Sequence, residues 1–501
     1  MIILDTVSFA TNDVKIYFAG AGAGKTSALI NEMTELLKTY RPDEIAFVTY
    51  TKKGVAHGRE RARLANPGIG EDDLPYFKTL HSLCFKELGL TSENVIDKKE
   101  DLENFNRPLG YHITLSEAFE NQTEDDKLLI RYNALRSGCT KGAYVHGIYN
   151  ETRYSLLIKA YEEFKAVTKK VDYYDCLSKF CELNKPINVK VAFIDEAQDL
   201  TLLQWEVCKI AFSLCEKIII AGDDYQTIFS HSGSLPGVLI NLANRYKTVK
   251  IEKSYRLPEE VYKFTRGITG IITDKVEKDY KPVKNVKGFV EDVSDREFLS
   301  HKVKTDFALN GYQSYRWYYL FRNNCFIEKA AKEFSRLVIP YHTHNGFCLN
   351  ARSLAKIKKY YNFRKNGYAS KEVFNKFCKD NKIEDINAEF YESNLIPGEE
   401  RFAYHAYVEK YGVDALIEMA NKEPFLLLST THKVKGGEAD YVAVFLDCTK
   451  KTFQNQQVNI DEELRVFYVA CSRAKLGLYL VQSESKYNFE SIVAIVKERV
   501  A

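Results

Sequence analysis

The sequence lacks the features that mark a zinc-binding, secreted or membrane-spanning protein. There is no Cys-x-x-Cys pair among its 11 cysteines, and its ten histidines are scattered along the chain. An odd number of cysteines, of which Cys176 and Cys181 are the nearest pair, predicts reduced thiols in a cytoplasmic protein and argues against a zinc site. We recognise no signal peptide, and no apolar run reaches the roughly 18 residues of a membrane span.

A strong charge of one sign is also missing, because 71 basic and 68 acidic residues leave a net charge of only +3. A near-neutral chain can still bind nucleic acid through a local basic groove, so net charge does not decide the partner. The composition, 45% hydrophobic and 28% charged, is that of a folded protein, and 501 residues suggest about three domains.

Near its N-terminus the chain contains a phosphate-binding loop. An apolar strand ends at Phe18, and a helix begins at Lys25 and Thr26. The turn between them consists only of glycine and alanine: Gly20, Ala21, Gly22, Ala23 and Gly24. Such small residues let backbone N–H groups approach phosphates, while Lys25 reaches the β- and γ-phosphates and the Thr26 hydroxyl is a ligand for Mg²⁺.

A second nucleotide motif lies far downstream, where the apolar strand Val191–Ile194 ends in Asp195 and Glu196. Paired carboxylates suit a metal–nucleotide site, with Asp195 holding the metal and Glu196 orienting or deprotonating the attacking water. The two motifs in this order predict hydrolysis of ATP or GTP with Mg²⁺.

Short apolar strands alternate with helical stretches, which predicts an α/β protein with parallel sheets wrapped by helices. The expected strands are Ile16–Phe18, Ile45–Thr49, Val191–Ile194, Lys217–Ala221, Trp317–Phe321, Phe425–Ser429, Tyr441–Leu446 and Gly477–Val481. Residues 89–188 and 356–424 are polar and helical, and are interpreted as insertions. The predicted motor domains comprise residues 1–88 and 189–253, and residues 254–355 and 425–501.

Six further segments follow in a fixed order along the chain. They are Thr49 to Lys53, Thr79 to Ser82, Gly222 to Phe229, Ser254 to Arg256, Thr430 to Asp440, and Glu462 to Lys475. Together with the two nucleotide motifs, these segments resemble the UvrD/Rep/PcrA class of superfamily I DNA helicases. The resemblance covers residues 14–482 and implies two RecA-like motor domains that use ATP and Mg²⁺.

Hydrolysis of a γ-phosphate develops negative charge, which cations from a neighbouring domain can stabilise when a cleft closes. Arg256 and Arg473, each inside one of the motifs, are the candidates. The resemblance further implies that Gln226 contacts the γ-phosphate, Glu438 bonds the ribose and Tyr255 stacks on adenine. Asp223 and Asp224 are expected to support their loop.

Single-stranded nucleic acid is bound by phosphate contacts and by stacking of bases on aromatic side chains. The resemblance places the following residues along a DNA track: Thr49, Tyr50, Thr51, Thr79, His81, Thr430 and His432. Tyr50 is the best stacking candidate. A structural, hydrogen-bonded histidine remains the alternative interpretation for His81 and His432.

The sequence departs from the family pattern in four places. Residues 1–18 contain no Gln to read adenine, and Ser27 stands where the family often has an arginine, so we expect a relaxed nucleotide preference. His231 stands where the family usually has a base-stacking Trp, and remains a candidate DNA contact. The segment between Gly346 and Thr430 is short for the family.

Three functions are compatible with these patterns. The first is an ATP-dependent 3′→5′ DNA helicase that acts on single strands and single/double-strand junctions. The second is a single-strand translocase that remodels protein–DNA complexes or serves a partner nuclease. The third is a binding module without hydrolysis, which the full set of catalytic residues disfavours. Repair, replication and phage-related roles in the cytoplasm of a bacterial or infected cell all suit the resemblance.

The strand-separating element is predicted beyond the last arginine motif, in a polar turn that carries Tyr487 and Phe489. An aromatic face can replace the stacking partner that a melted base pair loses. Packing of Phe489 under a C-terminal helix with Ile492, Ile495 and Val496 is the alternative, and it makes Tyr487 the better candidate.

Overall fold

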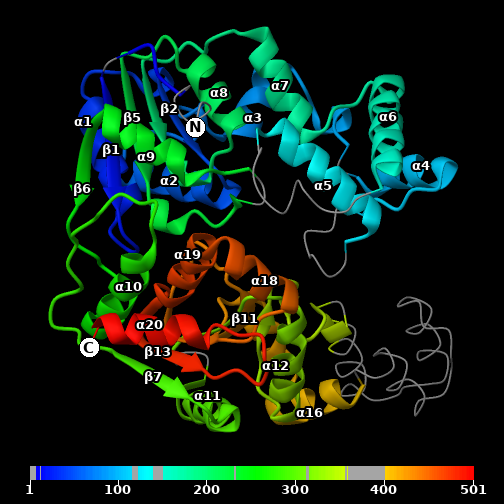
Figure 1. Ribbon diagram of the computed structural model, residues 1–501, viewed down its shortest axis with the longest axis vertical. Helices are drawn as coiled ribbons and strands as arrows, with labels where there is room; N and C mark the ends of the chain where they lie inside the picture. The colour runs from blue at the N-terminus through cyan, green and yellow to red at the C-terminus, as the bar shows by residue number, and fades with distance from the viewer. Residues whose placement is uncertain are drawn as a thin grey trace, which may run out of the picture. The chain divides into compact units, whose positions relative to one another are not determined.

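The computed structural model describes residues 7–11, 13–96, 98–114, 122–138, 150–230, 233–311, 315–351, 353–355, 358 and 401–500. The chain forms two compact units (Figure 1). The first takes in residues 1–286, 454–472 and 499–501, and the second takes in residues 287–453 and 473–498. The sequence pattern had assigned residues 254–286 and 454–472 to the second motor domain, whereas the structure packs them with the first unit.

The first unit is built on a parallel sheet whose described strands follow the order β3-β2-β4-β5-β1-β6. Its strands are β1 (Val14–Ala19), β2 (Ile45–Thr49), β3 (Phe77–Thr79), β4 (Val191–Ile194), β5 (Lys217–Gly222) and β6 (Lys247–Ile251). Strands such as β2 and β4 are buried at every position, because helices cover both faces of the sheet. The sequence pattern did not predict β3 and β6.

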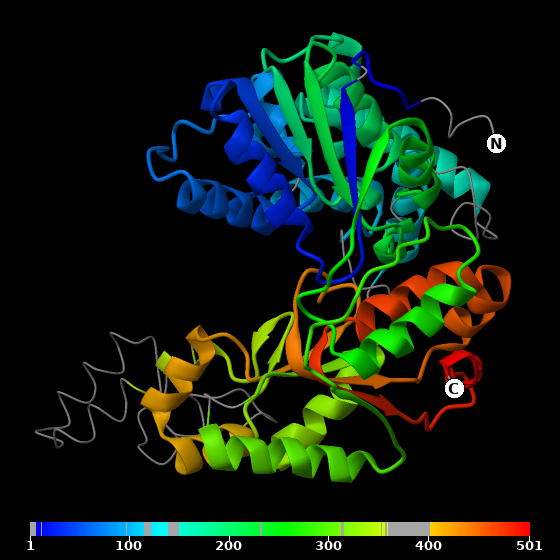
Figure 2. The ribbon, with the colours of Figure 1, turned by 90° about the vertical axis from the view of Figure 1, so that its left-hand side faces the viewer.

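Helices lie on both faces of this sheet (Figure 2). Alternate strand residues such as Phe47 and Phe193 pack against α1 and α2, while Val48 and Ile194 face the opposite core under α3, α7, α8 and α9. These helices are α1 (Lys25–Leu36), α2 (Lys52–Ala65), α3 (Leu80–Glu87), α7 (Tyr173–Leu183), α8 (Leu202–Ala211) and α9 (Pro236–Arg245). The first unit also contains α10 (Glu259–Ile271), α19 (Ile460–Cys471) and the single turns η5 (Ala197–Asp199) and η6 (Asp224–Gln226).

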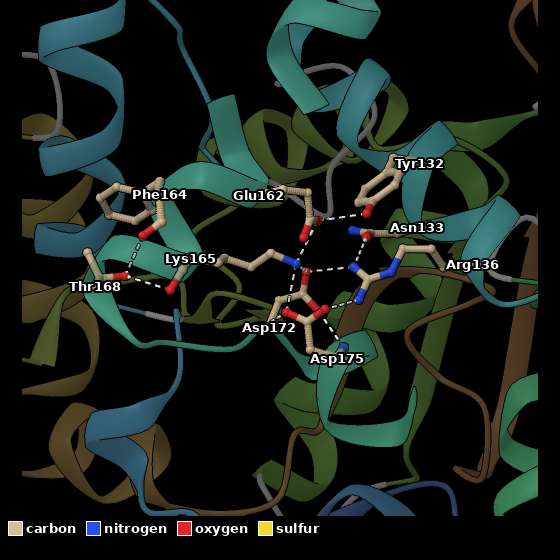
Figure 3. Close-up of polar contacts among 9 residues, drawn as sticks. All are labelled: Tyr132, Asn133, Arg136, Glu162, Phe164, Lys165, Thr168, Asp172 and Asp175. Atoms are coloured by element: carbon tan, nitrogen blue, oxygen red, sulfur yellow. Dashed lines mark hydrogen bonds and ion pairs between the residues drawn. The ribbon is translucent and has the colours of Figure 1, made fainter. Parts of the chain in front are cut away.

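The insertion predicted at residues 89–188 is helical where it is described. Beyond α3 it contains α4 (Lys99–Leu109), α5 (Glu124–Arg136) and α6 (Glu151–Thr168), and it ends with α7. A buried charge network joins α5, α6 and α7 (Figure 3). Lys165 Nζ lies 2.7 Å from Asp175 Oδ2 and 3.4 Å from Asp172 Oδ2, and Arg136 Nη1 lies 2.7 Å from the same Asp172 oxygen. Because cations and carboxylates are paired, we assign this network a structural role.

The second unit has a sheet whose described strands follow the order β10-β9-β11-β8-β12-β13-β7, parallel except for the β9–β10 pair. The strands are β7 (Phe289–Val293), β8 (Trp317–Phe321), β9 (His342–Thr343), β10 (Gly346–Phe347), β11 (Leu426–Thr430), β12 (Ala439–Phe445) and β13 (Ala474–Val481). Its helices are α11 (Arg296–Asn310), α12 (Cys325–Arg336), α16 (Arg401–Tyr411), α17 (Val413–Asn421) and α20 (Glu490–Val500), while α18 (Lys450–Val458) runs from the second unit into the first. The insertion predicted at residues 356–424 lies largely outside the described residues.

Parallel strands bring the motifs of the first unit to one edge of its sheet. The phosphate loop follows β1, Thr49 to Thr51 follow β2, Thr79 ends β3, Asp195 follows β4, and Asp223 follows β5. Ligands of open α/β sheets bind outside the carboxyl ends of the strands, which makes this edge the candidate site.

Candidate nucleotide site and flanking residues

The phosphate loop adopts a tight turn that requires glycine at two positions. Gly22 and Gly24 have φ values of 67° and 77°, in the left-handed region that side chains disfavour. A Cβ at Gly22 would also lie 2.4 Å from Arg256 Cβ. The Ala28 N–H donates to Gly24 O at 3.0 Å, so the helix begins directly after the loop and its positive N-terminal end faces the phosphate position.

The two predicted magnesium ligands are in direct contact. Thr26 Oγ1 donates to Asp195 Oδ2 at 2.9 Å, and the Glu196 N–H donates to Asp195 Oδ1 at 2.9 Å. Hydroxyl and carboxylate oxygens are the donors that Mg²⁺ prefers, so Thr26 and Asp195 fit this ion. Burial, followed by the negative charge of Glu196, raises the pKa of Asp195 to about 6. A bound cation would stabilise the charged carboxylate and so lower this pKa.

The predicted base, Glu196, has a left-handed backbone with φ 52°. Non-glycine residues in this conformation concentrate at functional sites, because surrounding structure must hold them there. Gln198, from η5, donates from Nε2 to Glu196 Oε2 at 2.5 Å. The sequence analysis did not single out Gln198, although it lies only two residues beyond the carboxylate pair.

Gln226 belongs to a buried loop that packs around a buried lysine, Lys278. Its Nε2 donates to Asp223 Oδ2 at 2.7 Å, and Lys278 Nζ lies 3.1 Å from Asp223 Oδ1 and also pairs with Asp224. Lys278 is 1% exposed and also lies over the Tyr225 ring. Asp223 and Asp224 therefore hold their loop together around a lysine. Nothing in the polar stretch around Lys278 signalled this role.

The segment that carries Arg256 is bonded to the phosphate loop. Ser254 Oγ donates to Ala21 O at 2.9 Å, and the Tyr255 N–H donates to Gly22 O at 2.8 Å. These bonds explain why the segment packs with the first unit. Tyr255 is 68% exposed, and its ring passes 3.5 Å from the position of a Cβ at Gly24. Arg256 Nη1 donates to Ser472 O at 3.5 Å.

Two tyrosines that sequence reasoning missed also contact the loop. Tyr468, on α19, accepts a hydrogen bond from the Ala21 N–H at 3.0 Å, and its hydroxyl lies 3.1 Å from that of Tyr280. The Tyr280 ring closes over Gly20, where a Cβ would lie 2.3 Å from it. Tyr468 stands in the last arginine motif, five residues before Arg473, and this was the only available signal.

Ser27 follows the Lys-Thr pair and is bonded to a neighbouring helix. Arg61 Nη1, from α2, donates to Ser27 Oγ at 2.8 Å. A guanidinium group therefore lies beside the position where the family often has an arginine. Nothing in the sequence pattern assigned Arg61 to this position.

In the second unit, Arg473 and Glu438 precede neighbouring strands. Ala439 pairs with Ala474 at the start of β12 and β13, and the Ala439 N–H donates to Arg473 O at 3.1 Å. Arg473 Nη1 donates to Gly437 O at 3.2 Å, and Glu438 lies 3.6 Å from Lys475 Nζ. Within this unit the register of two strands thus brings together both predicted nucleotide contacts.

The predicted DNA residues of the first unit follow β2 and β3. Thr51 and Thr79 act as helix N-caps, because their Oγ1 atoms accept hydrogen bonds from Gly54 N at 3.0 Å and Ser82 N at 3.2 Å. Thr49 is buried. The Tyr50 ring stacks on Phe229, with 5.6 Å between centroids and 22° between planes. Phe229 was part of a quoted motif, but the sequence analysis gave it no role.

His81 packs its ring edge-on against Tyr173, 5.6 Å between centroids. Burial lowers the pKa of His81 to about 4, so its imidazole is neutral near pH 7.

In the second unit, Thr430 ends β11 and is buried, and His432 follows in the turn. His231 lies outside the described residues.

The predicted strand-separating turn follows β13. Phe489 is buried at 4% exposure with Ile492, Val493 and Val496, whereas Ile495 is 44% exposed. Phe489 therefore packs under α20, and Val493 takes the inward position that the helical spacing had given to Ile495. Tyr487 is half-buried, and its ring centroid lies 5.7 Å from that of Phe453.

These observations define a class of protein. A parallel sheet that carries a phosphate loop after one strand and a metal-binding carboxylate after another is the nucleotide-binding domain of a P-loop nucleoside triphosphatase. In the described residues, no group of three or more His, Cys, Asp or Glu is arranged to hold a metal ion. No described helix is long and apolar enough to cross a membrane.

Comparison with known proteins gives the family. The UvrD/REP helicase N-terminal domain matches residues 5–247, and the UvrD-like helicase C-terminal domain matches residues 146–485. The chain belongs to the UvrD-like helicase family.

Similar proteins include the "ATP-dependent DNA helicase Rep" of Escherichia coli, 25% identical over 288 residues, which are 51% of this chain and 41% of that protein. The "DNA helicase II" of Haemophilus influenzae is 22% identical over 372 residues, 66% of this chain and 49% of that protein. The "Probable DNA helicase II homolog" of Mycoplasma pneumoniae is 24% identical over 294 residues, 52% and 41% of the two chains. The chain thus spans about half the length of the curated relatives it matches.

Proposed function

We propose that the chain is an ATP-dependent motor that moves 3′→5′ along single-stranded DNA and separates duplex DNA. The contact between Thr26 and Asp195, beside Glu196 and next to the phosphate loop, is the observation that carries this proposal. The family and the names of the relatives support DNA as the track, with single/double-strand junctions as substrates.

Four residues of the first unit are proposed to carry out the bond-making and bond-breaking steps of hydrolysis. Lys25 binds the phosphate oxygens of ATP. Thr26 and Asp195 would hold Mg²⁺, which would neutralise charge that develops on those oxygens. Glu196 accepts a proton from the water whose oxygen bonds to the γ-phosphorus as the bond to the β–γ bridging oxygen breaks. The products are ADP and inorganic phosphate.

Two arginines and a glutamine complete the proposed mechanism. Arg256 is tied by its own backbone segment to the phosphate loop, and Gln226 is held by Asp223 in the neighbouring loop. We propose that Arg256 and Arg473 stabilise the charge of the transition state and that Gln226 contacts the γ-phosphate. Glu438 and Tyr255 are proposed to hold the ribose and the base.

The test is DNA-stimulated ATPase activity of Lys25→Ala, with Lys38→Ala as the matched control. Lys25 is 9% exposed, whereas Lys38 follows the same helix with a side chain that is 66% exposed. We expect Lys25→Ala to lose turnover while it keeps the wild-type melting temperature, and Lys38→Ala to remain active. Normal DNA-stimulated hydrolysis by Lys25→Ala would overturn the proposed function.

A further inference from the structure

The Glu196 carboxylate accepts a hydrogen bond from a buried amide, that of Gln198. Gln198 is 1% exposed, and its side chain spans the gap between the turn after β4 and the loop after β5. Nε2 donates to Glu196 Oε2 at 2.5 Å, and Oε1 accepts from the Asp223 N–H at 3.0 Å. Both ends of the amide are therefore engaged.

These partners fix the orientation of the amide. A backbone N–H can only donate, so the atom that faces Asp223 N is the carbonyl oxygen Oε1. The NH₂ group consequently faces Glu196, whose carboxylate can accept. A hydrogen bond to a charged partner is stronger than one between neutral groups, so the amide holds the carboxylate in place.

The surroundings leave Gln198 little freedom to move. A Cβ at Gly222 would lie 3.0 Å from Gln198 Oε1 and 2.5 Å from Leu239 Cδ2, so β5 approaches the amide closely only because it ends in glycine. The contact therefore depends on the absence of a side chain at that position, and it is part of how the two loops pack.

The same hydrogen bonds extend to Gln226. The Asp223 N–H donates to Gln198, and the Asp223 carboxylate accepts a hydrogen bond from Gln226 Nε2 at 2.7 Å. Lys278 Nζ, 3.1 Å away, neutralises this carboxylate. Glu196 and Gln226, on separate loops, are thus connected through Gln198 and Asp223.

We propose that Gln198 is a positioning residue, which holds the Glu196 carboxylate for attack and sets it relative to the loop that carries Gln226. This inference rests on the proposed function, because it assumes that Glu196 is the base for ATP hydrolysis. Gln198 does not touch the substrate and acts through Glu196.

The test compares Gln198→Met with Gln204→Met. Methionine keeps the length of the side chain and removes its hydrogen bonds. Gln204 is also buried, at 5% exposure, and its Oε1 accepts from Thr201 N at 2.9 Å in the N-cap of α8. Loss of a partner that orients a catalytic group costs about 10- to 100-fold. We expect that loss in kcat for Gln198→Met, with KM for ATP within about threefold of wild type, and no comparable loss for Gln204→Met.

A double variant distinguishes a positioning role of Gln198 from a general loosening of the structure around it. If Gln198 acts through Glu196, adding Gln198→Met to Glu196→Gln should lower single-turnover hydrolysis by less than about twofold further. Gln198→Glu, which keeps the shape but brings a second carboxylate to Glu196, should also lose turnover. Full additivity in the double variant, wild-type kcat in Gln198→Met or Gln198→Glu, or an equal loss in Gln204→Met would each overturn the inference.

The proposed function fails separately, through normal DNA-stimulated hydrolysis by Lys25→Ala. Wild-type turnover by Glu196→Gln alone would show that another group is the base, and would overturn the role of Gln198 as well. A loss in Glu196→Gln together with wild-type turnover in Gln198→Met would leave the proposed function standing and overturn only the role of Gln198.

Discussion

At the scale of single residues, Arg256 and Arg473 differ in how the fold holds them. Arg256 follows two residues that bond to the phosphate loop, whereas Arg473 precedes β13 and donates to Gly437 O. We predict that Arg256→Ala and Arg473→Ala each lower kcat far more than they weaken ATP binding, because their charges serve the transition state. Steady-state kinetics and equilibrium nucleotide binding measure the two effects.

Arg336→Ala is a suitable control for both variants, because Arg336 is an exposed arginine at the end of α12. It should leave both parameters unchanged. A large loss of ATP affinity with unchanged kcat in Arg256→Ala or Arg473→Ala would reassign that arginine to ground-state binding.

His81 should make the folded protein sensitive to acid. Its pKa is lowered by burial from 6.5 to about 4, so the unfolded chain takes up a proton at a higher pH than the folded chain. Its contribution to stability is therefore complete above pH 6.5 and is lost as the pH falls toward 4. We predict that His81→Asn loses less stability than wild type between about pH 7 and pH 5. Urea midpoints at the two pH values measure this, and equal losses would contradict it.

At the scale of elements, the turn between β13 and α20 divides its two aromatic residues. Phe489 belongs to the core under α20, and Tyr487 lies half-buried beside Phe453. We predict that Phe489→Ala costs about 3–5 kcal/mol of unfolding free energy, as expected for a buried phenylalanine.

Tyr487→Ala should keep DNA-stimulated ATPase activity and lose duplex unwinding. Unchanged unwinding by Tyr487→Ala would exclude this turn as the strand-separating element.

The contact between α1 and α2 bears on the choice of nucleotide. Arg61 lies beside Ser27, and the exposed Tyr255 ring lies beside Gly24. A cation and an aromatic face attract either purine, and residues 1–18 supply no Gln to read the base edge. We predict that the enzyme hydrolyses GTP as well as ATP, with a preference for ATP that is far smaller than a thousandfold. Competition between ATP and GTP tests this, because a thousandfold preference requires about 4 kcal/mol of base-specific contact.

At the scale of the whole molecule, strand displacement distinguishes the two motor functions. We predict that the chain separates duplex DNA carrying a 3′ single-stranded tail, in the presence of ATP, and leaves a 5′-tailed duplex intact. Lys25→Ala is the control without hydrolysis. Strong DNA-stimulated ATPase activity with no strand displacement on either substrate would favour the alternative, a translocase that remodels protein–DNA complexes or serves a partner nuclease.

Much of the fold could be predicted because its signals are local. Ile45–Thr49, Val191–Ile194 and Trp317–Phe321 are strands as expected, since each is a short apolar run followed by a turn. The short strand β3 and the half-exposed strand β6 carry no such run and were missed. Residues 254–286 and 454–472 were assigned by motif order, whereas hydrogen bonds that join Ser254, Tyr255 and Tyr468 to the phosphate loop pack them with the first unit.

The sequence by itself determined the family, and it predicted the residues of the nucleotide site, because glycines, Lys25, Thr26, Asp195 and Glu196 are recognised by their spacing within short motifs. The tertiary structure alone decided which other residues support them. Gln198, Lys278, Tyr280 and Tyr468 reach their partners from separate elements, and Phe489 rather than Tyr487 joins the core. Burial and long-range hydrogen bonds depend on how strands and helices pack, and no local pattern in a single chain encodes them.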